Sequence, residues 1–100
     1  MPKSTMNTTL NYSPNFDVKK RRVKDVKFLI FHYTGMKKEN QAITRLTDSK
    51  SKVSSHYLIK NNGEILTLVP DLYVAWHAGV SSWKNYKSIN KYSIGIEISN

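Results

Sequence analysis

The sequence contains no cysteine, which excludes a disulfide-stapled scaffold and any thiolate metal site made by this chain. It also has no long apolar run, since runs such as Phe28–Phe31 are far too short to cross a bilayer. Residues 1–20 hold no apolar segment of the kind that a secretory signal needs. These absences predict no membrane span and indicate a cytoplasmic location, while a periplasmic one stays open.

The positive charge of the chain is unevenly distributed, and residues 61–100 have no excess of it. Residues 1–60 carry 13 Lys/Arg against 4 Asp/Glu, whereas residues 61–100 carry 3 of each. The excess centres on Lys19-Lys20-Arg21-Arg22, a run that could bind an anionic polymer or simply be a solvated lead-in segment. The run has no interleaved aromatic residues on which bases would stack. We therefore expect no nucleic-acid partner.

The length and composition fit one small soluble domain. The chain has 100 residues, of which 39% are hydrophobic and 23% are charged, as in ordinary globular proteins. We expect residues 1–24 to form a polar, basic N-terminal arm and residues 25–100 to form the N-terminal portion of a domain whose C-terminal part is missing.

The hydrophobic pattern predicts an α/β fold with a mixed sheet and flanking helices. Apolar residues favour strands near 27–32, 54–60, 65–69 and 93–98, and helical spacing favours a helix near 38–49. Both alternating sets of the first strand are apolar, which predicts a strand in the middle of the sheet, covered on both faces. Asn62-Gly63 predicts a hairpin with a type I′ turn.

Three histidines and one glutamate are candidates for chemistry. His32, His56 and His77 match no local zinc motif, and each taken singly is more typical of a structural histidine. His32 stands out because it ends an apolar strand, where an imidazole needs a partner. Glu97 lies within Ile-Gly-Ile-Glu-Ile. It either faces solvent on an edge strand or, near an apolar sheet, has a raised pKa and acts as a general base.

Gly95 is expected on the same face of this strand as Glu97. It carries no side chain, so a ligand could approach the strand closely there. Residues 71–92 are irregular and aromatic, and we expect a surface loop that folds over a neighbouring feature. Its aromatic residues are Tyr73, Trp76, Trp83, Tyr86 and Tyr92.

The order of the segments resembles one family, the N-acetylmuramoyl-L-alanine amidases that include AmpD-type enzymes, phage T7-type lysozyme and peptidoglycan recognition proteins. The resemblance covers roughly residues 12–100. It is carried by Ile30-Phe31-His32-Tyr33-Thr34, Val53-Ser54-Ser55-His56-Tyr57-Leu58-Ile59, Asn62-Gly63-Glu64-Ile65, Leu68-Val69-Pro70, Ala75-Trp76-His77-Ala78-Gly79, and Asn90 with Ser93-Ile94-Gly95-Ile96-Glu97.

The resemblance implies hydrolysis of the amide between N-acetylmuramic acid and L-alanine in peptidoglycan or muropeptides, by zinc-activated water. It places the first zinc-binding histidine at His32 and the catalytic base at Glu97. Ser55 stands where phage-type relatives have a helping tyrosine, so the sequence follows the Glu-type branch. Trp76, His77 and Asn90 are implied to bind substrate, and neither His56 nor His77 is implied to bind metal.

The resemblance also implies an incomplete zinc site. The family's second zinc histidine, its third ligand and a catalytic lysine would fall beyond Asn100, so one of three expected ligands is present and the site is expected to be truncated. The alternative is a non-catalytic peptidoglycan-binding module. We expect His32 and Glu97 to point into one crevice from neighbouring strands, and His56 and His77 not to converge with His32.

Overall fold

The computed structural model describes residues 8–78, 82–83 and 86–100. Residues 1–7 of the expected arm and parts of the expected aromatic loop, 79–81 and 84–85, lie outside these residues. No helix in the described ranges is both long enough and apolar enough to cross a membrane.

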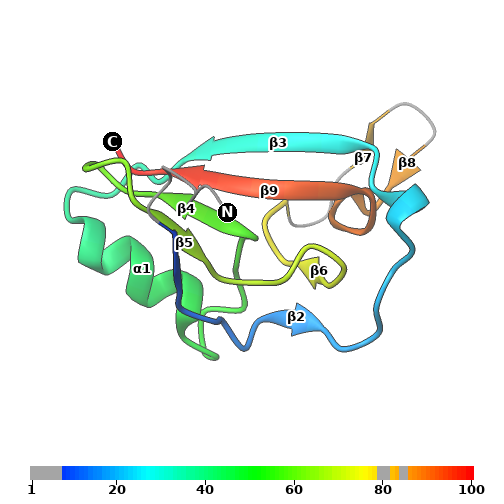
Figure 1. Cartoon of the computed structure of the whole chain (residues 1–100), viewed down its shortest axis with the longest axis horizontal. Coiled ribbons are helices and arrows are strands. Elements are labelled where there is room, and N and C mark those ends of the chain that lie inside the picture. The colour runs from blue at the N-terminus through cyan, green and yellow to red at the C-terminus, as the bar shows by residue number, and fades with distance from the viewer. Residues whose placement is uncertain (1–7, 79–81, 84–85) are drawn as a thin grey trace, which may run out of the picture.

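Within these residues, five strands form one mixed sheet in the order β1-β5-β4-β9-β3 (Figure 1). β9 runs parallel to both β3 and β4, β4 and β5 are antiparallel, and β1 adds to β5 in parallel. The predicted α/β class is therefore confirmed, as are the four predicted strands. The bounds are β1 Thr8–Leu10, β3 Phe28–Tyr33, β4 Tyr57–Ile59, β5 Ile65–Thr67 and β9 Ser93–Ile98.

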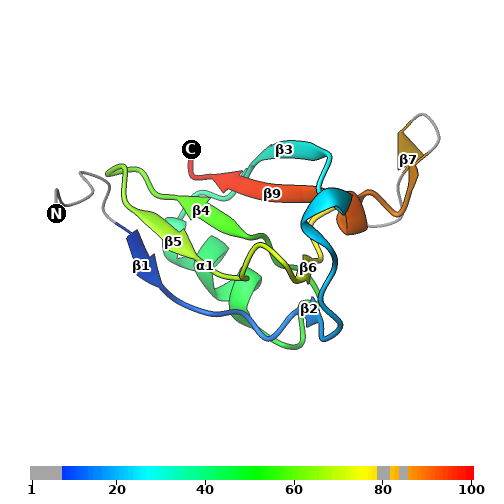
Figure 2. The same ribbon diagram turned by 45° about the vertical axis from the view of Figure 1, so that its right-hand side comes forward.

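Part of the expected arm joins the domain. β1 forms the far edge of the sheet beside β5 (Figure 2), and β2 (Phe16–Asp17) pairs with β6 (Val74–Ala75). β7 (Ser82–Trp83) pairs with β8 (Tyr86–Lys87), and two short 3₁₀ helices complete the elements. These helices are η1 (Val23–Asp25) and η2 (Ile89–Tyr92).

The helix α1 (Glu39–Thr47) covers β4 and β5 on one side, as Figures 1 and 2 show. Its Leu46 belongs to one apolar cluster with Leu58, Leu66 and Leu68. The predicted helix is confirmed, and its apolar spacing is what brings Leu46 onto the sheet. This cluster anchors the half of the sheet that carries β4.

The hairpin between β4 and β5 forms as predicted, but its turn differs. Of Asn62 and Gly63, only Gly63 has a positive φ, 87°, whereas a type I′ turn needs a positive φ at both residues. The Gly63 amide donates to the Lys60 carbonyl at 2.9 Å, and the Lys60 amide donates to the Glu64 carbonyl at 2.8 Å. The connection is thus a three-residue loop that ends in a left-handed glycine.

The prediction that the first strand lies in the middle of the sheet is wrong. β3 is at the edge of the sheet in the described residues, with β9 on one side. Leu29, Phe31 and Tyr33 are 61%, 58% and 72% exposed. Apolar residues on both faces of a strand indicate that its side chains could be buried. The sheet topology decides with how many strands it pairs.

Candidate functional site

His32 and Glu97 lie side by side on neighbouring strands. The parallel register of β3 and β9 pairs these two residues directly, and Glu97 is paired in turn with Leu58 of β4. Residues opposite one another in a sheet present their side chains on the same face. The predicted adjacency of His32 and Glu97 is therefore confirmed, and both lie on the face that α1 covers.

Glu97 is a carboxylate in an unusual environment. Its Oε2 atom is buried and has no hydrogen-bond partner in the part of the chain that the structure describes. Burial raises the pKa of the Glu97 carboxyl, and the nearby charges of His32 and Arg45 oppose that rise. A buried carboxyl oxygen without a partner costs free energy, so it is a natural position for a bound ligand or a reacting water.

His77 occupies the space that the sequence assigned to a ligand. A Cβ placed on Gly95 would lie 2.4 Å from the Cγ and Cδ2 atoms of the His77 ring. The expectation that Gly95 admits a ligand is therefore corrected, because the imidazole of His77 packs directly on the backbone of β9. Gly95 is required at this position because any side chain would displace that ring.

His77 lies next to His32, a contact between two rings that the expectation about convergence of all three histidines on one point did not cover. The Nε2 atom of His32 lies 3.2 Å from the Nδ1 atom of His77, and the ring centroids are 5.4 Å apart. His56 lies close as well, with its ring centroid 6.2 Å from that of His77. Even so, the described residues contain no group of three His, Asp or Glu that could hold a metal ion.

Hydrogen-bond directions fix the tautomers of this histidine pair. The Ser93 hydroxyl donates to the Ile89 carbonyl at 2.8 Å, so its oxygen accepts from Nε2–H of His77 at 3.0 Å. The Nδ1 atom of a neutral His77 is then an acceptor, and His32 must donate to it through Nε2–H. Burial, followed by neighbouring His32, lowers the pKa of His77 to about 3, which keeps its ring neutral. The remaining ring nitrogen of a neutral His32, Nδ1, is the basic one.

His56 is a structural histidine. Its side chain is fully buried, and its Nδ1 accepts the Gly95 amide at 3.0 Å. Its Nε2–H therefore donates to the Tyr73 carbonyl at 2.8 Å. Burial lowers the pKa of His56. Both nitrogens of this imidazole are engaged, which agrees with the expectation that His56 is not a metal ligand.

Trp76 and Asn90 hold the segment that carries His77. The Trp76 indole donates to Asp17 Oδ1 at 2.8 Å. Asn90 Oδ1 accepts the backbone amides of His77 at 3.2 Å and Ala78 at 2.8 Å. These contacts bring both residues close to the site, while their roles toward a substrate stay predictions.

The sequence did not identify Arg21 and Ser93 as parts of this region. Arg21 donates from Nη1 to the Asn90 carbonyl at 3.0 Å and from Nη2 to the Asp71 carbonyl at 2.8 Å. Its place within a basic run hid this role, because an arginine that anchors loops is indistinguishable in sequence from its solvated neighbours. Ser93, the residue that accepts from His77, was part of the segment around Glu97 that carries the resemblance, but no role was assigned to it.

The described residues do not fit a complete zinc site. Catalytic zinc takes three protein ligands and keeps one open position. His32 offers one imidazole nitrogen and Glu97 lies beside it, but His77 and His56 use both of their nitrogens within the fold. The chain therefore presents one candidate ligand and one candidate base.

Comparison with known proteins gives a consistent result. The family model of N-acetylmuramoyl-L-alanine amidase matches residues 22–100. The chain is 43% identical over 82 residues to the N-acetylmuramoyl-L-alanine amidase AmiD of Escherichia coli, covering 75% of this chain and 29% of AmiD.

Solved structures agree with this match. The crystal structure of a Se-Met AmpD derivative superimposes with a TM-score of 0.73 at 29% identity, over 98% of this chain and 63% of AmpD. AmiD from E. coli, in complex with the substrate anhydro-N-acetylmuramic acid-L-Ala-D-gamma-Glu-L-Lys, gives a TM-score of 0.66 at 41% identity, over 76% of this chain and 31% of that chain. The chain thus spans between a quarter and just over half of the length of the curated relatives that it matches.

Proposed function

The chain belongs to the N-acetylmuramoyl-L-alanine amidase family, and we propose that it takes part in hydrolysing the amide between N-acetylmuramic acid and L-alanine. The proposed substrates are peptidoglycan or muropeptides. The names of AmiD and AmpD relatives support this reaction, as does the muropeptide substrate bound to AmiD.

One observation carries the proposal: the buried Oε2 atom of Glu97 has no partner in the described residues and lies on the same face as His32. We assign Glu97 as the general base. Its carboxylate accepts a proton from the attacking water and returns it to the departing amine of L-alanine. Because burial raises its pKa, Glu97 holds the proton more readily than an exposed carboxylate would.

Zinc is the metal of this family in general, and His32 is the residue we propose as a zinc ligand. The fixed direction of the His32–His77 hydrogen bond leaves His32 Nδ1 for that contact. Since a second and third ligand are not among the described residues, no catalytic step through the metal is assigned to this chain.

Trp76, His77 and Asn90 are proposed to border the substrate. Both ring nitrogens of His77 are already engaged, so its contribution would be to shape the floor of the site rather than to donate to the sugar or peptide. Trp76 and Asn90 would keep segment 76–78 in place while substrate binds.

The ligand count predicts the behaviour of the purified 100-residue chain. After dialysis it should retain well below one equivalent of zinc and should not cleave an anhydro-muramyl tripeptide, because one histidine leaves the ion hydrated and exchangeable. Metal analysis and chromatography of the muropeptide test this. About one equivalent of zinc, with turnover that His32→Ala abolishes, would show that the chain completes its site in another way.

The role of Glu97 is tested in a chimera in which this chain replaces the matching segment of AmiD. Glu97→Gln should lower kcat by roughly 10²–10⁴-fold, the usual contribution of a general base. Glu64→Gln is the matched control, because Glu64 is paired with Lys60 on the hairpin, 2.9 Å apart. A chimera with Glu97→Gln that keeps its kcat within about twofold would contradict the assignment.

A second function is muropeptide binding without cleavage. It is favoured by the lack of a three-ligand group among the described residues. Calorimetry with the same tripeptide would distinguish the two, since binding by a zinc-free chain without release of the peptide would support recognition alone.

A further inference from the structure

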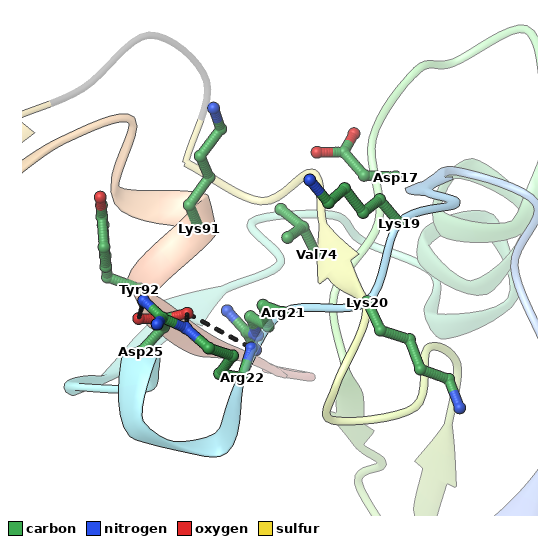
Figure 3. Close-up of a pocket in the computed structure, with 9 residues that line it drawn as sticks. All are labelled: Asp17, Lys19, Lys20, Arg21, Arg22, Asp25, Val74, Lys91 and Tyr92. Atoms are coloured by element: carbon green, nitrogen blue, oxygen red, sulfur yellow. Dashed lines mark hydrogen bonds and ion pairs between the residues drawn. The ribbon is translucent and has the colours of Figure 1, made fainter.

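A cavity of about 560 Å³ lies over the basic run of the chain, away from His32 and Glu97. Figure 3 shows its lining, which comes from the run itself, from β6 and from the end of η2. Neither histidine of the hydrogen-bonded pair nor Glu97 contributes to it. Its lining residues are Asp17, Lys19, Lys20, Arg21, Arg22, Asp25, Val74, Lys91 and Tyr92; we call this cavity the basic pocket.

Positive charge dominates the basic pocket. Its lining has five cationic side chains and two carboxylates, and both carboxylates are engaged. Asp25 pairs with Arg22 through two contacts of 3.1 Å, and Asp17 accepts the indole of Trp76. The described residues offer no ion-pair partner to Lys19 or Lys91. In Figure 3 these two lysines extend from different segments, Lys91 from η2 and Lys19 from the chain after β2.

The positive charge has a fixed component. The Arg21 guanidinium is half-buried and donates to the carbonyls of Asp71 and Asn90. Carbonyl oxygens fix its position without neutralising its charge, so Arg21 adds a permanent positive charge beside the pocket lysines. Several cations around one concavity are the arrangement that attracts anionic oxygen groups.

The aromatic rings near the pocket argue against a nucleic acid. Tyr92, the aromatic residue of the lining, packs edge-to-face with Tyr86 at 5.0 Å, and outside the lining Tyr73 packs in the same way with Phe16 at 5.0 Å. Lys20 also lies over the Tyr73 ring, 5.5 Å from its centroid. Binding of single strands relies on free aromatic faces for stacking, and these rings are already in contact. An anionic polymer without bases fits the lining better.

We propose that the basic pocket binds the anionic oxygen groups, phosphodiester or carboxylate, of a carbohydrate or polyol polymer. Lys19 and Lys91 contact the anion, and Arg21 supplies the fixed charge beneath it. The pocket would hold the protein on an anionic wall polymer independently of the site at His32 and Glu97. This inference does not depend on catalysis, so an inactive protein can test it.

The test compares two doubly substituted proteins that lose the same charge. Lys19→Gln with Lys91→Gln removes two lysines of the pocket that have no ion-pair partner among the described residues. Lys37→Gln with Lys50→Gln is the control, because both lysines are exposed and neither lines the pocket. Binding is measured by fluorescence anisotropy with three labelled probes of equal charge, which are a glycerol-phosphate polymer, polygalacturonate and a single-stranded oligonucleotide.

We expect the pocket variant to bind one or both of the first two polymers about tenfold more weakly or worse, as for the loss of two charge-assisted contacts. The control should change affinity by less than about threefold, and the pocket variant should show a shallower salt dependence. The polymer that binds more tightly identifies the anionic group. Equal losses in both variants, no binding by the unaltered protein, or a preference for the oligonucleotide would overturn the proposal.

Discussion

The two faces of the sheet are built from the same strands but are covered differently. On one face, α1 packs over Leu58 and the ring of His77 packs over Gly95. On the other face, Leu29 and Phe31 of β3 are more than half exposed. The covered face holds both the leucine cluster and the polar residues of the site, whereas these apolar side chains of β3 stay exposed on the other face, contrary to the simplest expectation for a soluble protein.

The difference between the faces bears on the site. Burial raises the pKa of the Glu97 carboxyl, and Glu97 lies on the covered face beside Leu58. The open face is an apolar surface of the kind that usually marks an interaction site. Core substitutions on the covered face should therefore change stability strongly, and substitutions on the open face should change it little.

The largest difference is expected from the core of the covered face. Leu58 is fully buried in the cluster with Leu46, so Leu58→Ala should lower the free energy of unfolding by about 2–5 kcal/mol through lost burial and a cavity. Urea denaturation followed by circular dichroism measures this. A loss below about 1 kcal/mol would show that the cluster is not packed as described.

A somewhat smaller loss is expected at the contact between Gly95 and His77. Gly95→Ala should destabilise the protein by roughly 1–3 kcal/mol, because its Cβ would overlap the imidazole ring. In a His77→Ala background the same change should cost much less, since the ring is gone. A double-mutant cycle measures this coupling. Additive effects of the two substitutions would contradict the contact.

Replacing Glu97 should change the free energy of unfolding by a small amount that depends on pH. Burial raises the pKa of its carboxyl, so its contribution to stability is present below the unfolded pKa and is lost as pH rises through the folded pKa. Measured between about pH 4 and 8, Glu97→Gln, which never ionises, should become more stable relative to the parent as pH rises through the folded pKa of Glu97. The gain should stay below about 1 kcal/mol, because the side chain is only half-buried and solvent screens its charge.

Glu64 serves as a control, because the pH dependence of its contribution to stability is expected to have the opposite sign. Hydrogen bonds from Lys60 and Thr9 lower the pKa of Glu64, so its contribution is present above the unfolded pKa and is lost as pH falls through the folded pKa. Glu64→Gln should therefore lose stability relative to the parent as pH rises. Thermal unfolding of both variants across this pH range measures the two slopes, and parallel slopes would refute the environment described for Glu97.

The smallest change in stability is expected on the open face. Phe31 is 58% exposed, so Phe31→Ser should alter the free energy of unfolding by less than about 0.5 kcal/mol. It should also reduce self-association, because it removes apolar surface from an edge strand. Sedimentation velocity alongside denaturation tests both effects. A loss above about 1 kcal/mol would mean that this face is covered in solution.

Several features of the fold and site could be predicted from local sequence. The apolar runs located four strands, helical spacing located α1, and the segment order placed His32 and Glu97 on neighbouring strands, where the register now pairs them. The arm was harder, since Thr8–Leu10 is a strand only because the edge of β5 is available to pair with it. The turn type was missed because the loop between the hydrogen-bonded residues Lys60 and Glu64 has three residues, not two.

The sequence by itself determined the family, the α/β class and the two candidate catalytic positions, because these depend on residue types at fixed spacings along the chain. Only the tertiary structure decided which neighbours those residues meet. The contact of His77 with His32 joins residues 45 positions apart, and the missing side chain of Gly95 serves that ring rather than a ligand. The alternation of residues along a strand indicates on which face of the sheet each side chain lies. Packing between segments that are distant in sequence decides which residues cover that face.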